Sequence, residues 1–289
     1  MTFVTRFAPS PTGLLHLGHA YSALLAHDMA RHRNGKFLLR LEDIDQQRCH
    51  QKWEECIFED LTWLGIKWDE PVRRQSRNLK SYQDALQDLW KRSLLYPCRC
   101  SRRDILSALS APHTSNASFG PDGPVYPGTC RPNDDNQLGL IPDDNVALRL
   151  NVAKSATGKE FNFVECRHNT DGVKREIPVL GGDLIANVGD FVVSRRGYLG
   201  SYHLCVVLDD AAQRITDVIR GQDLFSATKI HVLLQYLFDL PTPVYHHHTL
   251  ITDKDGKRLA KRDDARAISL YREAGASPDD IRELVGLTD

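Results

Sequence analysis

The sequence predicts an α/β protein whose parallel sheet is interrupted in the middle of the chain by an irregular inserted module. Two features predict this fold. Apolar segments of strand length alternate with amphipathic segments of helix length over the first 65 residues, which is typical of a parallel sheet covered by helices. From residue 98 to about 144 the composition changes to Ser, Pro, Gly, Asn and Asp, and strand-like segments return afterwards.

The first half of the chain is expected to begin with a strand, a loop and a helix. Residues 2–8 have a strand pattern, and Pro9, Pro11 and Gly13 then force a loop. The first helix is expected from Leu17 to about Gly35. The next elements are a strand over 36–41, a helix that ends at Gly65 with Trp53, Ile57, Leu61 and Leu64 on its apolar face, and a helix over 79–95 that stops at Pro97.

The second half is expected to return to the sheet. Strands are expected over 146–152, 161–164, 190–193, 203–208 and 215–219, a helix over 224–240, a strand over 244–251 and two short helices within 264–285. This divides the chain into a first half of the sheet domain (1–97), an inserted module (98–180), a second half (181–265) and a short helical tail (266–289). The run His246-His247-His248 alternates faces on its strand, which favours surface and core histidines over a ligand set.

Composition and charge place few limits on the partners. The 289 residues are 41% hydrophobic and can bury a sizeable core. The net charge of -1 requires any nucleic acid to be met by a local basic face. The first residues reach two prolines before a signal peptide could form, and no apolar run suits a membrane span, so we expect a cytoplasmic monomer. Seven scattered cysteines argue against a disulfide framework.

The first loop and helix together favour an anion site. The unpaired N–H groups and the positive dipole end of the helix would lie outside the carboxyl end of the first strand. His16 and His19 are three residues apart, so both rings lie on one face of the first turn, and Gly18 between them leaves room for a flat base. The alternative is a polar helix start with two solvated histidines.

A second basic segment and a group of thiols are further candidates. Gly256 begins a run with four cations, Lys257, Arg258, Lys261 and Arg262, which could clamp pyrophosphate or be a solvated turn. Cys98, Cys100, Cys130 and Tyr126 fall in the inserted module. A Cys-x-Cys spacing is tighter than that of a usual zinc finger, so zinc binding and simple packing both stay open from spacing alone.

Six phrases in order resemble the catalytic core of class I glutamyl-tRNA synthetases. They are RFAPSPTG (6–13), HLGH (16–19), LLRLEDID (38–45), VVLDD (206–210), VIRGQDL (218–224) and GKRLAKR (256–262). The resemblance implies a Rossmann-type domain that makes glutamyl-adenylate from L-glutamate and ATP with Mg²⁺, and then passes the glutamyl group to RNA. HLGH stands where the family has HIGH. Residues 258–262 stand where it has KMSKS, and they depart from it everywhere except at Lys261.

The resemblance also implies roles for individual residues. The implied catalytic residues are His16, His19 and Lys261. The implied glutamate-binding residues are Arg6, Phe7, Ala8, Pro9, Ser10, Glu42, Tyr202 and Arg220, and the implied ATP-binding residues are His16, Gly18, His19, Arg258, Leu259 and Lys261. A related subgroup implies Zn²⁺ on Cys98, Cys100, Tyr126 and Cys130. Guanidinium groups suit a carboxylate and Glu42 suits an ammonium group; for Arg220 the alternative is an ion pair with Asp209, Asp210 or Asp223.

The RNA substrate is inferred from length. Only 27 residues follow Arg262, whereas the full-length synthetases carry a helical anticodon-binding domain there. The chain resembles truncated bacterial paralogues that glutamylate queuosine in the anticodon stem-loop of aspartate tRNA, and Arg73, Arg74, Arg77, Arg99, Arg102 and Arg103 are candidate phosphate contacts. Two alternatives stay open: a stand-alone glutamyl-tRNA synthetase core that charges the tRNA 3′ end, and a non-catalytic RNA-binding module.

Overall fold

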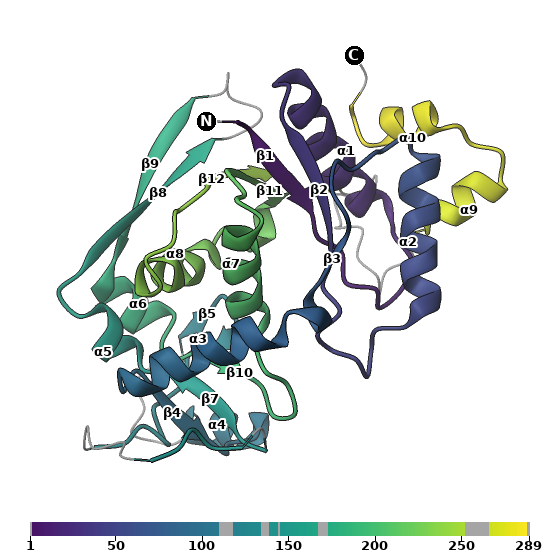
Figure 1. The fold of residues 1–289 in the computed structure, drawn as a ribbon. Helices are drawn as coiled ribbons and strands as arrows, with labels where there is room; N and C mark the ends of the chain where they lie inside the picture. The colour runs from purple at the N-terminus through teal and green to yellow at the C-terminus, as the bar shows by residue number, and fades with distance from the viewer. Residues whose placement is uncertain are drawn as a thin grey trace.

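The fold begins with a three-stranded parallel sheet (Figure 1), in a computed structural model that describes residues 2–109, 118–133, 139–143, 145–166, 173–251 and 266–287. The strands β1 (Val4–Phe7), β2 (Lys36–Leu41) and β3 (Arg73–Arg74) pair in that order, and both pairs are parallel. Helix α1 (Leu17–His32) joins the first two strands and α2 (Gln51–Trp63) precedes the third. The βαβα alternation predicted for this half is confirmed.

A second sheet continues the first one sideways. It has the order β11 (Asp217–Gly221), β12 (Val244–His248), β8 (Glu160–Cys166) and β9 (Lys174–Leu180), with β9 the only antiparallel member. The Thr216 N–H donates to the Val4 carbonyl at 2.9 Å, and the Val4 N–H donates to Thr216 Oγ1 at 2.9 Å. These bonds bring β11 beside β1, so the carboxyl ends of β1, β2 and β11 meet along one edge.

Three further strands form a small antiparallel sheet. Its order is β10 (Val192–Ser194), β7 (Ala147–Leu150) and β4 (Leu95–Cys98). The other elements are η1 (Gln75–Arg77), α3 (Leu79–Lys91), α4 (Arg102–Leu109), β5 (Phe119–Gly120), β6 (Gly123–Pro124), α5 (Val152–Ala156), α6 (Gly181–Asn187), α7 (Tyr202–Ala212), η2 (Gln222–Leu224), α8 (Thr228–Leu237), α9 (Ile268–Glu273) and α10 (Pro278–Leu284). Figure 1 shows this sheet below α3, at the opposite end of the molecule from α10.

Two apolar clusters hold these layers together. One packs α1, α2 and α10 against β1 and β2, and the other packs α3, α7 and α8 around β8, β11 and β12. Five of the six β2 residues are buried, as expected for a parallel strand that is covered on both faces. Within the described ranges, no helix combines the length and apolar character needed to cross a membrane.

Some predicted elements differ from the structure. Residues 203–208 form part of helix α7 and not a strand; Ser201 caps the helix through Oγ, which accepts from the Leu204 N–H at 3.4 Å. Seven of the eleven α7 residues are buried and only Ala212 is exposed, so no amphipathic period distinguishes residues 203–208 from a buried strand. The helix predicted over 224–240 is shorter, since η2 precedes α8, and β9 was not predicted at all.

The inserted module is not fully separate from the main sheet. Its strand β8 pairs in parallel with β12, so residues 160–166 join the parallel sheet although they precede residue 180. The two short helices predicted near the C-terminus are confirmed as α9 and α10. The domain boundaries at residues 97, 180 and 265 stay predictions.

The histidine run on β12 is wholly internal. His246, His247 and His248 are all buried, so the prediction that the run includes surface histidine is wrong. The strand lies between β11 and β8, and both of its faces are covered by other layers of the fold. Each ring has a polar partner: Asp217 for His246, Glu165 for His247 and Ser22 for His248.

Candidate active site

A cavity of about 200 Å³ opens at the carboxyl ends of β1 and β2, the edge at which α/β sheets bind ligands. Ser10, Glu42 and Tyr202, three of the residues expected to bind glutamate, line it. The other lining residues are Thr12, Ile44, Asp45, Arg48, Cys49, Gln75, Arg195, Tyr198 and Gly200. The sequence did not single out these last nine residues, because they are spread over loops that meet only in the folded chain.

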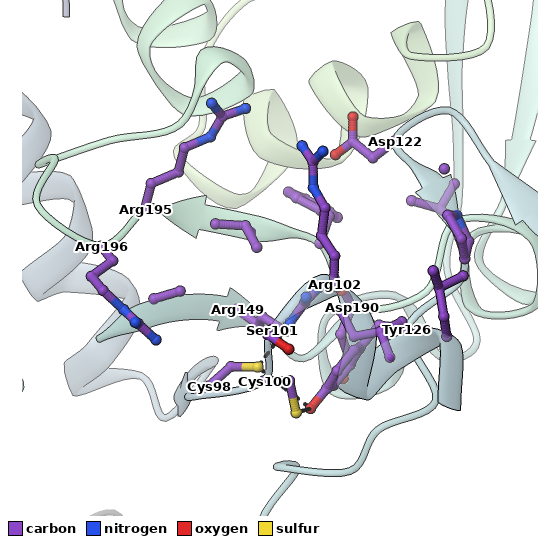
Figure 2. Close-up of a pocket in the computed structure, with 18 residues that line it drawn as sticks. Cys98, Cys100, Ser101, Arg102, Asp122, Tyr126, Arg149, Asp190, Arg195 and Arg196 are labelled. Atoms are coloured by element: carbon purple, nitrogen blue, oxygen red, sulfur yellow. Dashed lines mark hydrogen bonds between the residues drawn. The ribbon is translucent and has the colours of Figure 1, made fainter. Parts of the chain in front are cut away.

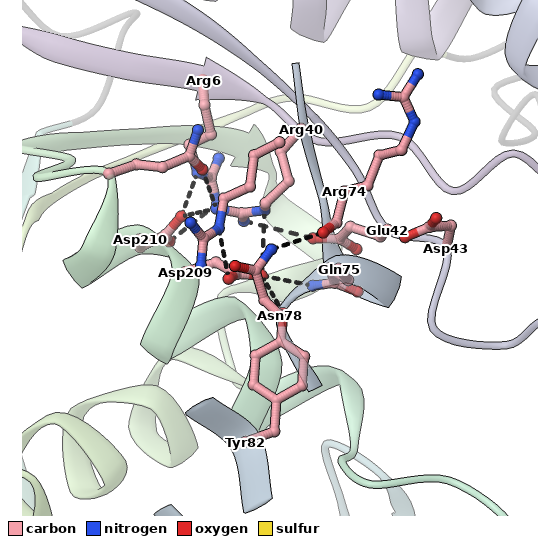
Figure 3. Close-up of polar contacts among 12 residues, drawn as sticks. Arg6, Arg40, Glu42, Asp43, Arg74, Gln75, Asn78, Tyr82, Asp209 and Asp210 are labelled. Atoms are coloured by element: carbon pink, nitrogen blue, oxygen red, sulfur yellow. Dashed lines mark hydrogen bonds and ion pairs between the residues drawn. The ribbon is translucent and has the colours of Figure 1, made fainter. Parts of the chain in front are cut away.

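Two buried arginines share one aspartate beside this cavity (Figure 3). Arg6 Nε lies 2.9 Å and Arg40 NH1 lies 2.7 Å from Asp210 Oδ1. Burial acts to raise the pKa of Asp210, but the two guanidinium groups outweigh it and hold the pKa below the usual value. Arg6 therefore approaches the cavity with its guanidinium already oriented by α7.

The neighbouring Asp209 ties three other segments to α7. The Tyr82 hydroxyl donates to its carboxylate at 2.8 Å, Gln75 Nε2 at 3.1 Å and Arg73 Nε at 2.8 Å (Figure 3). Asp209 and Asp210 thus both satisfy buried donors, which residue types alone did not reveal. The one sequence feature that could have indicated this role is the position of two adjacent acidic residues at the end of an apolar run. Arg73, and Arg74 through its ion pair with Glu54, are held by carboxylates, so the structure disfavours their suggested role as phosphate contacts.

Glu42 is the anionic group of the cavity. Its side chain is 10% exposed, and its Oε1 lies 3.4 Å from Arg40 NH2. Burial raises the pKa of Glu42 to about 7, although Arg40 and Arg6 act in the opposite direction. The Tyr202 pKa is raised chiefly by burial and then by the Glu42 charge, while Arg220 and Arg6 oppose the rise. The structure therefore places four predicted glutamate-binding residues close enough for their charges to interact: Arg6, Glu42, Tyr202 and Arg220.

Arg220 ends β11 with a guanidinium that is held by neutral groups. Its Nε donates to His247 Nε2 at 3.1 Å, its NH1 to His231 Nδ1 at 3.1 Å and its NH2 to Thr228 Oγ1 at 2.7 Å. Within the described part of the chain it forms no ion pair with a carboxylate, so the alternative pairing with Asp209, Asp210 or Asp223 is wrong. A buried cation surrounded by acceptors without charge suits an anionic ligand.

The first loop contributes mainly through its backbone. The Phe7 side chain is in the apolar core, and Pro9 is also buried. The Pro9 carbonyl accepts from the Glu42 N–H at 3.0 Å, which fixes the loop against the end of β2. Ala8 is half-buried and Ser10 is exposed at the cavity.

His16 and His19 form a reciprocal cap at the start of α1. The Gly18 N–H donates to His16 Nδ1 and the His16 N–H donates to His19 Nδ1, each at 3.1 Å, and the ring centroids are 3.8 Å apart. Since both Nδ1 atoms are acceptors, each neutral ring carries its proton on Nε2. A Cβ at residue 18 would lie only 3.1 Å from His16 Cε1, so a larger residue there would crowd the imidazole ring. Arg258, Leu259 and Lys261 lie outside the described residues.

The predicted zinc ligands lie together in the inserted module, and Figure 2 shows three of them, Cys98, Cys100 and Tyr126. The Cys98, Cys100 and Cys130 sulfurs all lie within 4.8 Å of one another, and Cys100 and Cys130 are 3.5 Å apart. The Tyr126 oxygen lies 3.5 Å from Cys98 Sγ and 3.4 Å from Cys100 Sγ. Sulfurs on a tetrahedral zinc with bonds of about 2.3 Å would be about 3.8 Å apart, so the donor set fits this ion.

The surroundings of the thiols shift their pKa values in opposite directions: burial raises that of Cys100, whereas that of Cys130 is lowered. Burial acts to raise the pKa of the Cys130 thiol, but hydrogen bonds with Tyr126, the Arg99 backbone and the other two cysteines lower it to about 7. Arg149 Nε donates to Cys98 Sγ at 3.3 Å, and its guanidinium carbon lies 3.8 Å from the centre of the Tyr126 ring. A cavity of about 910 Å³ adjoins the cluster, with Arg102, Arg195 and Arg196 on its wall (Figure 2).

The fold and this site together define the catalytic domain of an aminoacyl-tRNA synthetase: residues 2–288 match the model of the class I tRNA synthetase (E and Q) catalytic domain. The solved structure of glutamate-tRNA synthetase from Elizabethkingia anophelis superimposes with a TM-score of 0.74 at 25% identity, covering 99% of this chain and 61% of that one. This chain thus spans about three fifths of the length of that synthetase.

The curated relatives narrow the class further. Glutamyl-Q tRNA(Asp) synthetase of Rhodobacter capsulatus is 56% identical over 285 residues, which are 98% of this chain and all of the relative. The protein of the same name from Symbiobacterium thermophilum is 38% identical over 96% of this chain and 83% of its own length. The chain belongs to the glutamyl-Q tRNA(Asp) synthetase family.

Proposed function

We propose that the chain activates L-glutamate with ATP to give glutamyl-adenylate and then transfers the glutamyl group to queuosine in the anticodon loop of aspartate tRNA. The observation that carries this proposal is Arg220, a buried guanidinium with only neutral acceptors around it in the described chain. The names of the relatives support the RNA substrate.

Glutamate would bind between charges of opposite sign. Its distal carboxylate would accept from Arg220, and its ammonium group would lie against ionised Glu42. Glutamine would be disfavoured because its neutral amide leaves the buried guanidinium without a counter-charge. The charges of Glu42 and Arg220 act on the Tyr202 pKa in opposite directions, and the Tyr202 side chain would lie beside the carbon chain of glutamate.

Activation needs little acid–base chemistry. The α-carboxylate would attack the α-phosphorus in line and expel pyrophosphate, while the Nε2–H groups of His16 and His19 donate to the phosphate oxygens. Lys261 of the basic segment would add a positive charge. Mg²⁺ bound with ATP supplies further neutralisation of the phosphates. A hydroxyl group of the queuosine ring would then attack the acyl carbon and release AMP.

Zinc would be structural. Cys98, Cys100, Cys130 and Tyr126 would hold the ion and fasten β4 to the segment that follows β6. In this proposal no reaction step involves the cluster. We propose in addition that the protein works as a cytoplasmic monomer, which a light-scattering mass at micromolar concentration tests.

One experiment separates the candidate products. Radioactive glutamate is incubated with ATP, the protein and purified aspartate tRNA that either carries or lacks queuosine, and the labelled nucleotide is mapped by nuclease digestion. Label in the anticodon loop of the modified tRNA alone supports the proposal. Label on the terminal adenosine would assign 3′ charging, and the absence of glutamate-dependent pyrophosphate exchange would assign an RNA-binding role.

A further inference from the structure

A hydrogen-bonded row of side chains runs from Arg220 into the inserted module. Arg220 NH1 lies 3.1 Å from His231 Nδ1, and His231 Nε2 lies 3.0 Å from His203 Nδ1. His203 Nε2 then lies 2.9 Å from Asp122 Oδ1. Four residues from β11, α8, α7 and the turn between β5 and β6 are thereby joined in one row.

The direction of every bond in this row is determined by its ends. A guanidinium has only donors and does not lose its proton in proteins, so His231 Nδ1 must accept. His231 then carries its proton on Nε2 and donates to His203, which in turn donates from Nε2 to the Asp122 carboxylate. Burial and the Arg220 charge hold the pKa of His231 well below its usual value, which agrees with a neutral ring.

The hydrogen bonds on the other side of Arg220 have directions determined in the same way. His247 Nε2 accepts from Arg220, so His247 Nδ1 carries the proton and donates to Glu165 Oε2 at 2.7 Å. Each carboxylate is therefore separated from the guanidinium by one or two imidazoles. The guanidinium is fixed from two sides while its charge is left for a ligand.

We propose that Asp122, acting through His203 and His231, is a positioning residue that holds Arg220 for the distal carboxylate of glutamate and so sets the discrimination between glutamate and glutamine. The inference rests on the proposed function, because it takes the Arg220 ligand to be that carboxylate. Without an acceptor at residue 122, His203 can turn or change tautomer. His231 would then be free to present a donor to Arg220, which repels the guanidinium.

Asp122 is placed to act from a distance. Its side chain is 53% exposed, and it stands on the wall of the 910 Å³ cavity, well apart from the thiol cluster (Figure 2). It contacts neither the first loop nor Glu42 in the described structure. Its substitution therefore changes an exposed turn and removes no side chain from the lining of the 200 Å³ cavity.

The test compares three single variants by glutamate-dependent pyrophosphate exchange. Asp122→Ala removes the acceptor, and Asp122→Asn keeps an oxygen acceptor without the charge. Asp183→Asn is the matched control, because Asp183 is 50% exposed and faces Lys229 of the same helix as His231 but lies outside the row. For Asp122→Ala we expect a KM for glutamate raised roughly 3- to 10-fold with kcat within about twofold. The Asn variant should be intermediate and the control unchanged.

A second measurement does not depend on activity. Nitrogen-15 NMR of the labelled histidines should show Nε2-protonated, Nδ1-accepting rings for His203 and His231 in the wild type. In Asp122→Ala this pattern should weaken for both, whereas in Asp183→Asn it should persist. A wild-type ring protonated on Nδ1 at either position would overturn the inference, and so would an unchanged KM in Asp122→Ala.

The two proposals fail in different ways. If Arg220→Ala keeps the wild-type KM for glutamate, or if the wild type shows no exchange, the proposed function is wrong. If Arg220→Ala abolishes exchange but Asp122→Ala retains both the KM and the preference for glutamate over glutamine, only the present inference is wrong. A purely structural role for Asp122 would lower kcat and thermal stability together without changing the KM, which also contradicts it.

Discussion

Arg40 NH1 donates to Asp210 Oδ1 at 2.7 Å, and this bond joins the end of β2 to α7 across 170 residues of sequence. The Arg40 side chain is fully buried and that of Asp210 is 8% exposed. The same aspartate holds Arg6 of β1. One carboxylate of α7 thus holds the neighbouring strands β1 and β2 at the edge where the cavity opens.

Removal of the Asp210 carboxylate should lower the stability of the folded protein. We expect Asp210→Asn to lower the free energy of unfolding by about 3–5 kcal/mol, because two buried guanidinium groups lose their shared charge. Urea titration followed by circular dichroism measures this. Asp84→Asn is the control, since Asp84 pairs with Lys80 on the exposed surface of α3 and should change little. Equal midpoints for the two variants would show that the buried pair is unimportant.

Glutamate binding should strengthen as the pH rises through about 7. Burial raises the Glu42 pKa to about 7, so below that pH the carboxyl is neutral in the free protein and cannot pair with the ammonium group of glutamate. The dissociation constant, measured by calorimetry, should therefore fall about tenfold per pH unit below 7 and level off above it. In Glu42→Gln, binding should be weak and free of this dependence. Glu70→Gln, at an exposed ion pair with Lys36, should retain the wild-type profile.

The same pKa shift affects stability. A carboxyl whose pKa is higher in the folded than in the unfolded state binds more protons when folded, so its ionisation lowers stability. The loss should begin above the unfolded value of 4.5 and be complete above about 7. Glu42→Gln should thus be more stable than the wild type at pH 8 but not at pH 4, as thermal unfolding at the two pH values can test.

The two histidines at α1 allow capping to be separated from catalysis. His16→Ala should slow pyrophosphate exchange by about 10²-fold, by analogy with the loss of a transition-state donor, and cost about 1 kcal/mol of stability through the lost cap. Asparagine is a good helix cap but has no imidazole, so His16→Asn should restore stability without restoring the rate. Recovery of the exchange rate in the Asn variant would mean that His16 acts only as a cap.

Lys261 should act on the transition state rather than on substrate binding. Lys261→Ala is expected to lower kcat for exchange far more than it raises the KM for glutamate, because its charge is needed only as pyrophosphate leaves. The adjacent Arg262→Ala is the comparison. Wild-type exchange by the Lys261 variant would remove the basic segment from the mechanism.

Metal removal tests the thiol cluster. We expect purified protein to contain a single zinc ion, and Cys130→Ser to lose it together with thermal stability, because the remaining ligands no longer complete a tetrahedron. Cys56→Ser of α2 is the control, since Cys56 lies outside the cluster. Zinc content is measured by plasma mass spectrometry before and after dialysis against a chelator. Undiminished zinc in Cys130→Ser would contradict the ligand set.

Two incorrect predictions show that hydrophobic patterns identify an element poorly when the element is buried on several sides. Residues 203–208 look like a strand because a helix that is buried on all sides has no polar face. The side chains of the histidine run lie on alternate faces of the strand, which suggested one exposed face, yet neighbouring layers bury all three rings. By contrast, β2 was predicted with its observed bounds, because a short apolar run between turn residues is characteristic of a buried parallel strand.

The sequence by itself determined the parallel-sheet class, the first loop, the helix that follows it from Leu17, and the identity of the cysteine ligand candidates, since these depend on backbone preferences and spacing within a few residues. Only the tertiary structure decided that Arg220 is held by histidines rather than aspartates, that Asp209 and Asp210 satisfy buried donors, and that Asp122 of the inserted module is linked to Arg220 through two histidines. The partners of Asp210, Arg40 and Arg6, lie 170 and 204 residues away in the sequence, and which residues meet depends on how the layers pack around the shared core.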